Sequence, residues 1–195
     1  DGVLIPPRID DTFLINLAQS YGTRPVLTLT PIDASGTFNN NLITALVHNP
    51  DAIARLIEAL GVQITSRGFE GVDIDFEYIL PSDRVAFAEF VAAVRRSVNA
   101  LGFPVSVALA PKTSDDQKGV LYEGKDYALL GQAADYVLLM TYEWGYTYSV
   151  PMAVAPIDKV RRVVEYALTR IPAEKIDLGV PNYGSDWPLP YVAGP

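Results

Sequence analysis

The sequence lacks cysteine altogether and contains a single histidine among its 195 residues. The absence of cysteine excludes disulfide bonds, thiol nucleophiles and Cys-based zinc sites, and one imidazole excludes nearly every site that needs two. The single histidine, His48, stands directly before Asn49 and Pro50, a setting typical of the lead-in to a helix. We therefore do not expect His48 to serve a Ser-His-Asp triad.

Positive charge and long hydrophobic runs are also scarce. The chain has 15 Lys and Arg residues and 23 Asp and Glu residues, so its formal net charge is −8. We therefore expect no nucleic-acid partner, because the phosphates of nucleic acids are also negative. No apolar run approaches the ~20 residues of a membrane span, and the amino terminus lacks the basic start of a signal peptide, so we expect no membrane association. Hydrophobic residues make up 49% of the chain, which is enough for one sizeable core.

Short β-rich runs alternate with longer segments of helical period, the pattern of repeated βα units around a parallel sheet. Several runs are apolar at nearly every position, which predicts strands that are covered on both faces. We expect six strands, at Gly2 to Ile5, Pro25 to Thr30, Gly71 to Ile79, Pro104 to Ala110, Tyr136 to Tyr142 and Ile176 to Pro181.

Helical periodicity predicts three helices between these strands. The first follows the capping candidate Asn49, the second follows the capping candidate Ser82 and ends near Gly102, and the third begins at Pro156 and stops before Pro172. Their apolar stripes are Ile53, Leu56, Ile57 and Leu60, then Val85, Ala88, Val91, Val94 and Val98, then Val160, Val163, Val164 and Ala167.

Six strands in this order fit a doubly wound sheet or part of an eight-stranded (β/α) barrel. A complete barrel takes about 250 residues, and the chain starts on a strand and ends in residues 187–191 without a closing βα unit. We therefore expect the α/β class and an incomplete TIM barrel of about six βα units, as a single partial domain over residues 1–195 with no second domain. Its two open sheet edges would favour self-association.

The stretch from Gly71 to Tyr78 carries the clearest chemical signal. Side chains alternate along a strand, so Asp73, Asp75 and Glu77 share one face, about 6.5 to 7 Å apart. In an antiparallel sheet such acids would simply face water. Here helical segments precede and follow the strand, so the acidic face is expected to point into the barrel, where carboxylates are costly unless a shared proton, a hydrogen bond or a ligand compensates.

Close carboxylates do not all ionise easily, so one of them is expected to have a raised pKa and to act as a general acid. Glu77 is the candidate, because it has the longest reach and lies nearest the carboxyl end of the strand, where barrel enzymes place their sites. Asp75 would orient groups or stabilise charge, and Asp73 would tune Asp75 through a hydrogen bond.

The segment from Gly71 to Glu77 resembles the DGxDxDxE signature of glycoside hydrolase family 18, which includes chitinases and other β-N-acetylglucosaminidases on a (β/α) eight-stranded barrel. Met140-Thr141-Tyr142-Glu143-Trp144 resembles the sixth barrel strand of that family, and Gly179 to Gly184 resembles the seventh. The resemblance covers nearly the whole chain, as strands two to seven.

Three departures from the family pattern are informative. Glu70 replaces the first Asp of the signature, residues 28–31 replace the Ser-x-Gly-Gly element, and Glu143 stands where many members have Asp. Together with the segments Met140 to Tyr146 and Pro181 to Trp187, these departures resemble the bacterial spore-cortex and peptidoglycan branch. Its N-acetylglucosaminidases often carry LysM modules, and we recognise none in residues 1–195. That branch implies a cell-wall, spore or secreted setting.

The resemblance implies substrate-assisted retention without a cofactor or a metal ion, on a polysaccharide or oligosaccharide that contains N-acetylglucosamine. Glu77 would protonate the glycosidic oxygen and later act as base for water. Asp75 would hold the acetamido N–H, and Tyr142 would hydrogen-bond the acetamido oxygen.

Residues at the ends of the last two strands are candidates for substrate contact, with loop packing as the alternative for each ring. Trp144 and Tyr183 are the stronger candidates because they adjoin the catalytic strand ends, where flat rings can stack on sugar faces. The others are Met140, Glu143, Tyr146, Tyr148, Asn182 and Trp187.

A further segment, Gly119 to Lys125, matches most of a phosphate-binding loop. Asp126 stands where Ser or Thr would bind magnesium, so we do not expect a nucleotide site.

Two other functions stay open at this point. One is sugar binding without turnover, by a site that lacks part of the barrel. The other is a divalent-metal phosphoesterase with Asp73, Asp75 and Glu77 as oxygen ligands. No motif distinguishes chitin from peptidoglycan as the polymer.

Overall fold

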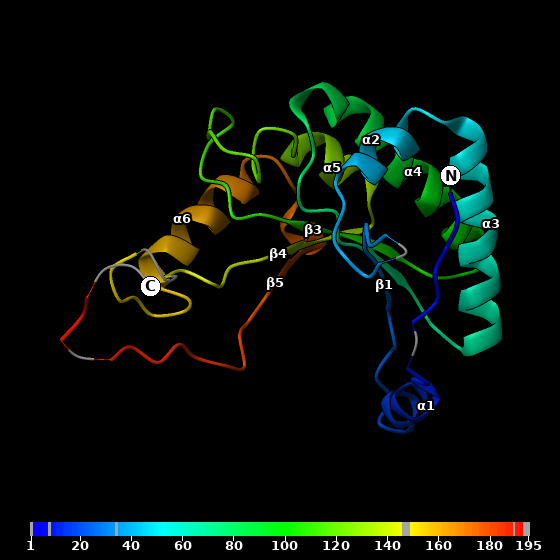
Figure 1. Ribbon diagram of the computed structural model, residues 1–195, viewed down its shortest axis with the longest axis horizontal. Coiled ribbons are helices and arrows are strands. Elements are labelled where there is room, and N and C mark those ends of the chain that lie inside the picture. The colour runs from blue at the N-terminus through cyan, green and yellow to red at the C-terminus, as the bar shows by residue number, and fades with distance from the viewer. Residues whose placement is uncertain (1, 8, 34, 146–148, 189, 193–195) are drawn as a thin grey trace.

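The computed structural model describes residues 2–7, 9–33, 35–145, 149–188 and 190–192. Two aromatic candidates, Tyr146 and Tyr148, lie outside these ranges. At the centre is a parallel sheet in the order β1-β2-β3-β4-β5 (Figure 1). The strands are β1 (Leu27–Leu29), β2 (Val72–Ile74), β3 (Val105–Leu109), β4 (Tyr136–Leu139) and β5 (Ile176–Leu178).

Helices follow the strands in alternation, and α1 projects away from the sheet (Figure 1). The helices are α1 (Thr12–Ser20), α2 (Asn41–Val47), α3 (Pro50–Arg67), α4 (Arg84–Ala100), α5 (Tyr127–Ala133) and α6 (Ile157–Leu168), with 3-10 turns η1 (Pro81–Asp83) and η2 (Ala173–Lys175). No helix within the described ranges is long and apolar enough to cross a membrane.

The strand order distinguishes the barrel that the sequence predicted from the doubly wound sheet that the strand pattern also fits. Each strand pairs in parallel with the next one along the chain. A doubly wound sheet reverses its order at a switch point, whereas a barrel adds each strand beside the previous one. The α/β class and the incomplete barrel are therefore confirmed. The self-association expected at the edges, β1 and β5, stays a prediction.

The strand predicted at Gly2 to Ile5 is wrong, because residues 2–7 form no strand. Gly2 has a φ of 72°, outside the β region. It also lies against α3, where an added Cβ would stand 2.1 Å from the carbonyl oxygen of Ala52. This close approach holds the start of the segment against the helix, and the described sheet has five strands instead of six.

The predicted helix starts were partly right. Asn49 caps α3 as expected, since its side chain accepts a hydrogen bond from the amide of Ala52 at 3.0 Å. Ser82 does not cap α4: the helix is preceded by the η1 turn and begins at Arg84. Val85, which was predicted to lie in the apolar stripe of this helix, is 53% exposed. The third helix begins directly after Pro156, as predicted.

The helices α1, α2 and α5 escaped the sequence analysis because they are short, at 9, 7 and 7 residues. So few turns give a weak periodic signal. α5 nonetheless has a clear local cause. The carboxylate of Asp126 accepts a hydrogen bond from the amide of Leu129 at 3.0 Å and caps the helix. The acid that argued against a phosphate loop therefore has a structural role.

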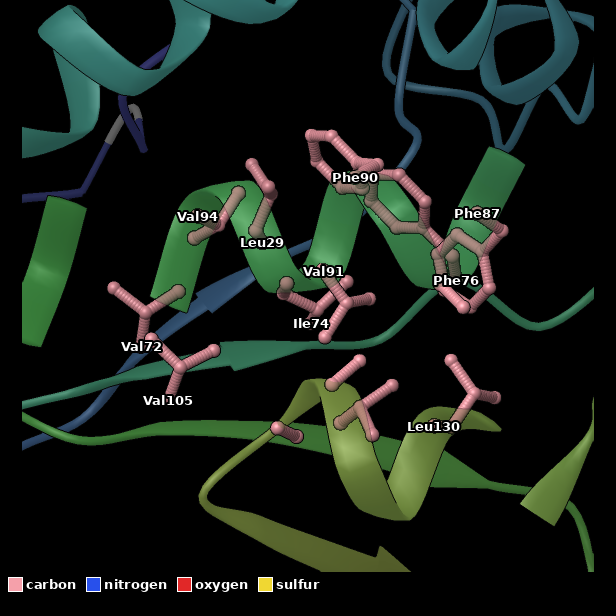
Figure 2. Close-up of a cluster of buried hydrophobic side chains, with 14 of the residues drawn as sticks. Leu29, Val72, Ile74, Phe76, Phe87, Phe90, Val91, Val94, Val105 and Leu130 are labelled. Atoms are coloured by element: carbon pink, nitrogen blue, oxygen red, sulfur yellow. The ribbon is translucent and has the colours of Figure 1, made fainter. Parts of the chain in front are cut away.

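The core that positions β2 lies between the sheet and α4, as Figure 2 shows. The ring of Phe76, 3% exposed, stacks on Phe87 and Phe90 with centroids 5.9 and 5.7 Å away. Val72 and Ile74, on the same face of the strand, are 1% and 0% exposed. Because one face of β2 is fixed against α4, its other face carries the acids away from the helices.

Candidate active site

The three acids expected on one face of β2 lie there. Val72, Ile74 and Phe76 are buried, and the intervening Asp73, Asp75 and Glu77 are partly exposed. The ladder ends earlier than predicted, at Ile74, and the amide of Asp75 donates to the carbonyl of Leu29 at 3.0 Å. Asp75 and Glu77 therefore follow the carboxyl end of the strand, where barrel enzymes carry their chemistry. We call Asp73, Asp75 and Glu77 the acid row.

Asp73 is the deepest member of the acid row and pairs in register with Ser106 of β3. The Ser106 hydroxyl donates a hydrogen bond to Asp73 Oδ1 at 2.5 Å. Burial raises the pKa of Asp73, the Ser106 hydrogen bond opposes this rise, and the charge of Asp75 adds to it. The expected hydrogen bond to Asp75 is not formed: acids two apart on one strand face are about 6.5 to 7 Å apart, so they interact through charge.

Asp75 has an unpaired oxygen. Its Oδ1 is buried and has no hydrogen-bond partner. An orphaned carboxylate oxygen is costly in a protein interior, which makes it an acceptor available to a ligand N–H. Burial raises the pKa of Asp75, and the nearby ammonium of Lys125 opposes the rise.

Glu77 lies at the outer end of the acid row. Burial raises its pKa, the charges of Asp75 and Glu143 add to the rise, and Lys125 opposes it. A raised pKa is the property that the sequence predicted for a general acid, and the other two members of the acid row share it. The role of Glu77 as that acid stays a prediction.

Lys125 is the residue near the acid row that the sequence analysis missed. It is 1% exposed, and its ammonium donates to the carbonyl of Ala108 at 3.0 Å. Burial lowers its pKa to about 8, against the opposing charges of the acid row. The sequence placed it only in a rejected phosphate loop. No local pattern marks it, because its place depends on the close approach of Gly124 to Ile79.

Tyr142 follows β4, and its ring is held by the end of β5. An added Cβ at Gly179 would stand 2.4 Å from the ring, so only glycine allows this contact. Thr141 fixes the same junction by donating to the Gly179 carbonyl at 3.0 Å. Burial raises the pKa of Tyr142, and Asp75 makes the largest charge contribution. Tyr142 therefore lies within electrostatic range of Asp75, on the segment that follows β4.

Glu143 connects this junction to Tyr183. Its φ of 62° is rare for a residue other than glycine and marks local strain, a feature that gathers at functional sites. The hydroxyl of Tyr183 donates to Glu143 Oε1 at 3.2 Å, and Tyr183 is 49% exposed. An exposed ring held by Glu143 is suited to contact a sugar face.

The remaining substrate candidates are less directly placed. Trp144 is partly buried against the core. Trp187 packs beside Gly145 and edge-on to Tyr191, and its indole N–H is buried without a partner. Met140 is partly buried, and Asn182 is exposed. Tyr142 and Glu143 lie within electrostatic range of the acid row, and Tyr183 is linked to it only through Glu143. Among the described residues no hydrogen bond joins the acid row to Met140, Trp144, Asn182 or Trp187, so the substrate roles of all these residues stay predictions.

Other sites that the sequence raised lie elsewhere. His48 is 3.0 Å from Asp83, at the junction of α2 and η1. An apolar cavity of about 680 Å³ lies beside β1, and no member of the acid row lines it. Within the described ranges no three acids or histidines form a group that could hold a metal ion. The acid row is thus the site with organised chemistry.

Comparison with known proteins agrees with this geometry. The glycosyl hydrolases family 18 matches residues 35–191. The chain is 40% identical over 194 residues to the cortical fragment-lytic enzyme of Bacillus subtilis (strain 168), covering 100% of this chain and 44% of that protein. The chain thus spans less than half the length of that relative.

Solved structures show the same similarity. The spore cortex-lytic enzyme SleL of Bacillus megaterium QM B1551 superposes with a TM-score of 0.90 at 36% identity, over 100% of this chain and 44% of that one. A chitinase from Chromobacterium violaceum ATCC 12472, 24% identical, shares the fold with a TM-score of 0.83 over 92% of this chain and 56% of that one. The acid row, the sequential parallel sheet and the match over most of the chain lead to one conclusion: the chain belongs to the glycosyl hydrolases family 18.

Proposed function

We propose that this chain carries the catalytic strands of a hydrolase of β-1,4-linked N-acetylglucosamine in spore cortex, peptidoglycan or chitin-like oligosaccharides. One observation carries the proposal. Asp75 has a buried carboxylate oxygen without a hydrogen-bond partner, and Glu77, two residues later on the same strand face, has a raised pKa. The similarity to cortex-lytic enzymes supports the class of polymer.

The first step uses Glu77 as the general acid. Its carboxyl proton goes to the glycosidic oxygen as the bond between that oxygen and the anomeric carbon breaks. The carbonyl oxygen of the 2-acetamido group on the same sugar forms the new bond to the anomeric carbon, so no enzyme nucleophile is needed. Asp75 Oδ1 accepts a hydrogen bond from the acetamido N–H and stabilises the positive oxazolinium ion. The Tyr142 hydroxyl donates a hydrogen bond to the acetamido oxygen.

The second step returns Glu77 to its starting state. The Glu77 carboxylate takes a proton from water as the water oxygen attacks the anomeric carbon, and the bond to the acetamido oxygen breaks. Two successive displacements leave the configuration of that carbon unchanged. Asp73, held by Ser106, stays behind Asp75 and adjusts its charge.

The surrounding residues are assigned to substrate binding by their places at strand ends. Tyr183, fixed by Glu143, would stack on a sugar face next to the acid row. Contacts farther along the chain of sugars are assigned to Met140, Trp144, Asn182 and Trp187.

Product analysis by mass spectrometry tests this function. The wild type is incubated with N-acetylglucosamine oligomers and with purified cortex fragments, beside Glu77→Gln and the matched control Glu70→Gln. Glu70 lies at the entrance of the same strand, paired with Arg24 at 4.0 Å. We expect products from the wild type and Glu70→Gln only. Products from Glu77→Gln at the wild-type rate would contradict the assignment.

Sugar binding without turnover is the second candidate, because the chain spans 44% of its cortex-lytic relative. Oligomer binding by both the wild type and Glu77→Gln, with no product from either, would favour it. The third candidate, a divalent-metal phosphoesterase, would be favoured if the chain hydrolysed a phosphate ester and lost that activity when a chelator removed the metal ion.

A further inference from the structure

Lys112 is a buried lysine that the proposed mechanism does not use. It follows β3, the strand that pairs with β2, and it is 3% exposed. Its ammonium donates a hydrogen bond to the carbonyl oxygen of Lys125 at 2.9 Å and reaches that of Asp115 at 3.5 Å. None of the ion pairs in the described part of the chain includes Lys112. Because an ammonium is costly to bury, its three donors are expected to be used, and here they are directed at backbone carbonyl groups.

The hydrogen bond from Lys112 to Lys125 closes the long loop between β3 and α5. The structure describes every residue of this loop, 110–126, and assigns no helix or strand within it. Loops of this length inside a compact domain are uncommon unless they serve a function. Tyr127, 1% exposed, fixes the same closure: its hydroxyl accepts a hydrogen bond from the amide of Lys112 at 3.0 Å and donates one to the carbonyl of Ala110 at 2.6 Å. The two ends of the loop are therefore held together.

The loop is also fixed to α6. The carboxylate of Asp115 accepts a hydrogen bond from the hydroxyl of Tyr166 at 2.6 Å and forms an ion pair with Arg170. The rings of Tyr166 and Tyr127 lie against each other, with centroids 5.2 Å apart. The first half of the loop therefore has a fixed support, from which Lys112 holds the second half.

The second half of the loop packs on the segment that carries Glu77. Gly124 precedes the residue whose carbonyl Lys112 holds, and an added Cβ there would stand 1.9 Å from the carbonyl oxygen of Ile79. Ile79 is 2% exposed and lies two residues after Glu77. Contact this close between two backbone segments leaves no space to absorb a shift, so a movement of one is transmitted to the other.

We propose that Lys112 is a positioning residue for Glu77. By holding the carbonyl of Lys125, its ammonium keeps the backbone of Gly124 against Ile79 and so fixes the segment from which the Glu77 side chain extends. The inference rests on the proposed function for its catalytic meaning. The contact between Gly124 and Ile79 is a property of the folded chain and is measurable without turnover.

The kinetic test uses the full chain and the substitution Lys112→Met, which removes the N–H donors and keeps an unbranched side chain. The matched control is Lys118→Met, the same substitution in the same loop at a lysine that pairs only with Glu123, at 3.2 Å. Both variants are assayed on N-acetylglucosamine oligomers at a temperature at which circular dichroism shows them folded. We expect kcat to fall by about tenfold or more in Lys112→Met, with little change in KM, because a misplaced acid slows the chemical step.

A merely structural role would lower the stability of Lys112→Met and leave kcat of the folded chain unchanged. That result would overturn the proposal, and so would an equal fall of kcat in Lys118→Met.

The contact itself is measured by NMR, as the nuclear Overhauser effect between the α-protons of Gly124 and the side chain of Ile79. We expect it in the wild type and in Lys118→Met, and we expect it to weaken in Lys112→Met. An unchanged effect in Lys112→Met would overturn the proposal.

The two measurements distinguish this inference from the proposed function. A weakened contact in Lys112→Met, in a protein whose wild type cleaves no oligomer, would reject the hydrolase and sustain the role of Lys112 in fixing the segment. Cleavage by the wild type, with the contact and kcat unchanged in Lys112→Met, would sustain the hydrolase and reject the inference.

Gly124→Ala covers the case in which Lys112→Met does not fold. Its new Cβ must displace the carbonyl of Ile79, whereas the control Gly184→Ala places its Cβ where no atom lies within 4 Å. We expect kcat to fall in Gly124→Ala and to stay at the wild-type value in Gly184→Ala. Equal kcat values in the two folded variants would overturn the proposal, because the position of Ile79 would then not govern Glu77.

Discussion

Replacement of Phe76 by alanine tests whether packing on one face of β2 fixes the acid row on the other. The Phe76 ring is 3% exposed and stacks on Phe87 and Phe90. Truncation of a buried phenylalanine costs about 3–5 kcal/mol, because apolar contact is lost and a cavity remains. Domains are stable by about 5–15 kcal/mol in total. We therefore expect Phe76→Ala to remain largely folded at low temperature, with the free energy of unfolding reduced by that amount.

The measurement is urea unfolding followed by tryptophan fluorescence, with Phe13→Ala as the matched control. Phe13 lies on α1 and is 71% exposed, so its loss should change the free energy of unfolding by less than about 0.5 kcal/mol. We also expect Phe76→Ala to bind N-acetylglucosamine oligomers more weakly than Phe13→Ala does, because Asp75 and Glu77 flank Phe76 in the chain. Equal stability and binding of the two variants would refute the reasoning.

Three further predictions concern single interactions. Gly124→Ala should lower the free energy of unfolding by about 1–3 kcal/mol, because the new Cβ meets the carbonyl oxygen of Ile79. In the same urea titration the control Gly184→Ala should be nearly neutral, because its new Cβ has no atom within 4 Å. Asn49→Ala should lower the free energy of unfolding by about 0.5–2 kcal/mol, because the α3 cap is lost. Asn40→Ala should lower it by less, because the Asn40 side chain makes no cap hydrogen bond. Equal losses in the two variants would contradict the capping assignment. Arg170 and Tyr166 hold the pKa of Asp115 at about 2, below its ordinary 3.8, so their stabilisation is present above about pH 4 and is lost as the pH falls toward 2. Asp115→Asn should flatten this part of the curve of stability against pH, and an unchanged slope would count against the pairing.

The sequence predicted best where one periodic signal determined the structure. Alternation from Val72 to Glu77 defined which residues are buried and which face the site, because side chains on a strand have a period of two. The pattern of strands and helices alone fits a barrel and a doubly wound sheet, because both contain the same βα units and differ only in where each new strand is added. The length of the chain favoured the barrel, and the strand order confirmed it.

The errors arose where contacts distant in the chain decide the structure. The approach of Gly2 to α3 removed a predicted strand. Lys125 was missed because its place beside the acid row depends on the contact between Gly124 and Ile79, 45 residues earlier in the chain. The local sequence around Lys125 resembles a phosphate loop, and only the folded arrangement gives it neighbours of opposite charge.

The proton NMR spectrum of the first-formed product tests the central claim most directly. The wild-type chain is mixed with a β-linked N-acetylglucosamine oligomer, and the anomeric signals of the new reducing end are followed before mutarotation. Substrate-assisted catalysis by Asp75 and Glu77 predicts that the β anomer appears first and that Glu77→Gln releases none. Initial release of the α anomer, or equal release by Glu77→Gln, would contradict the account.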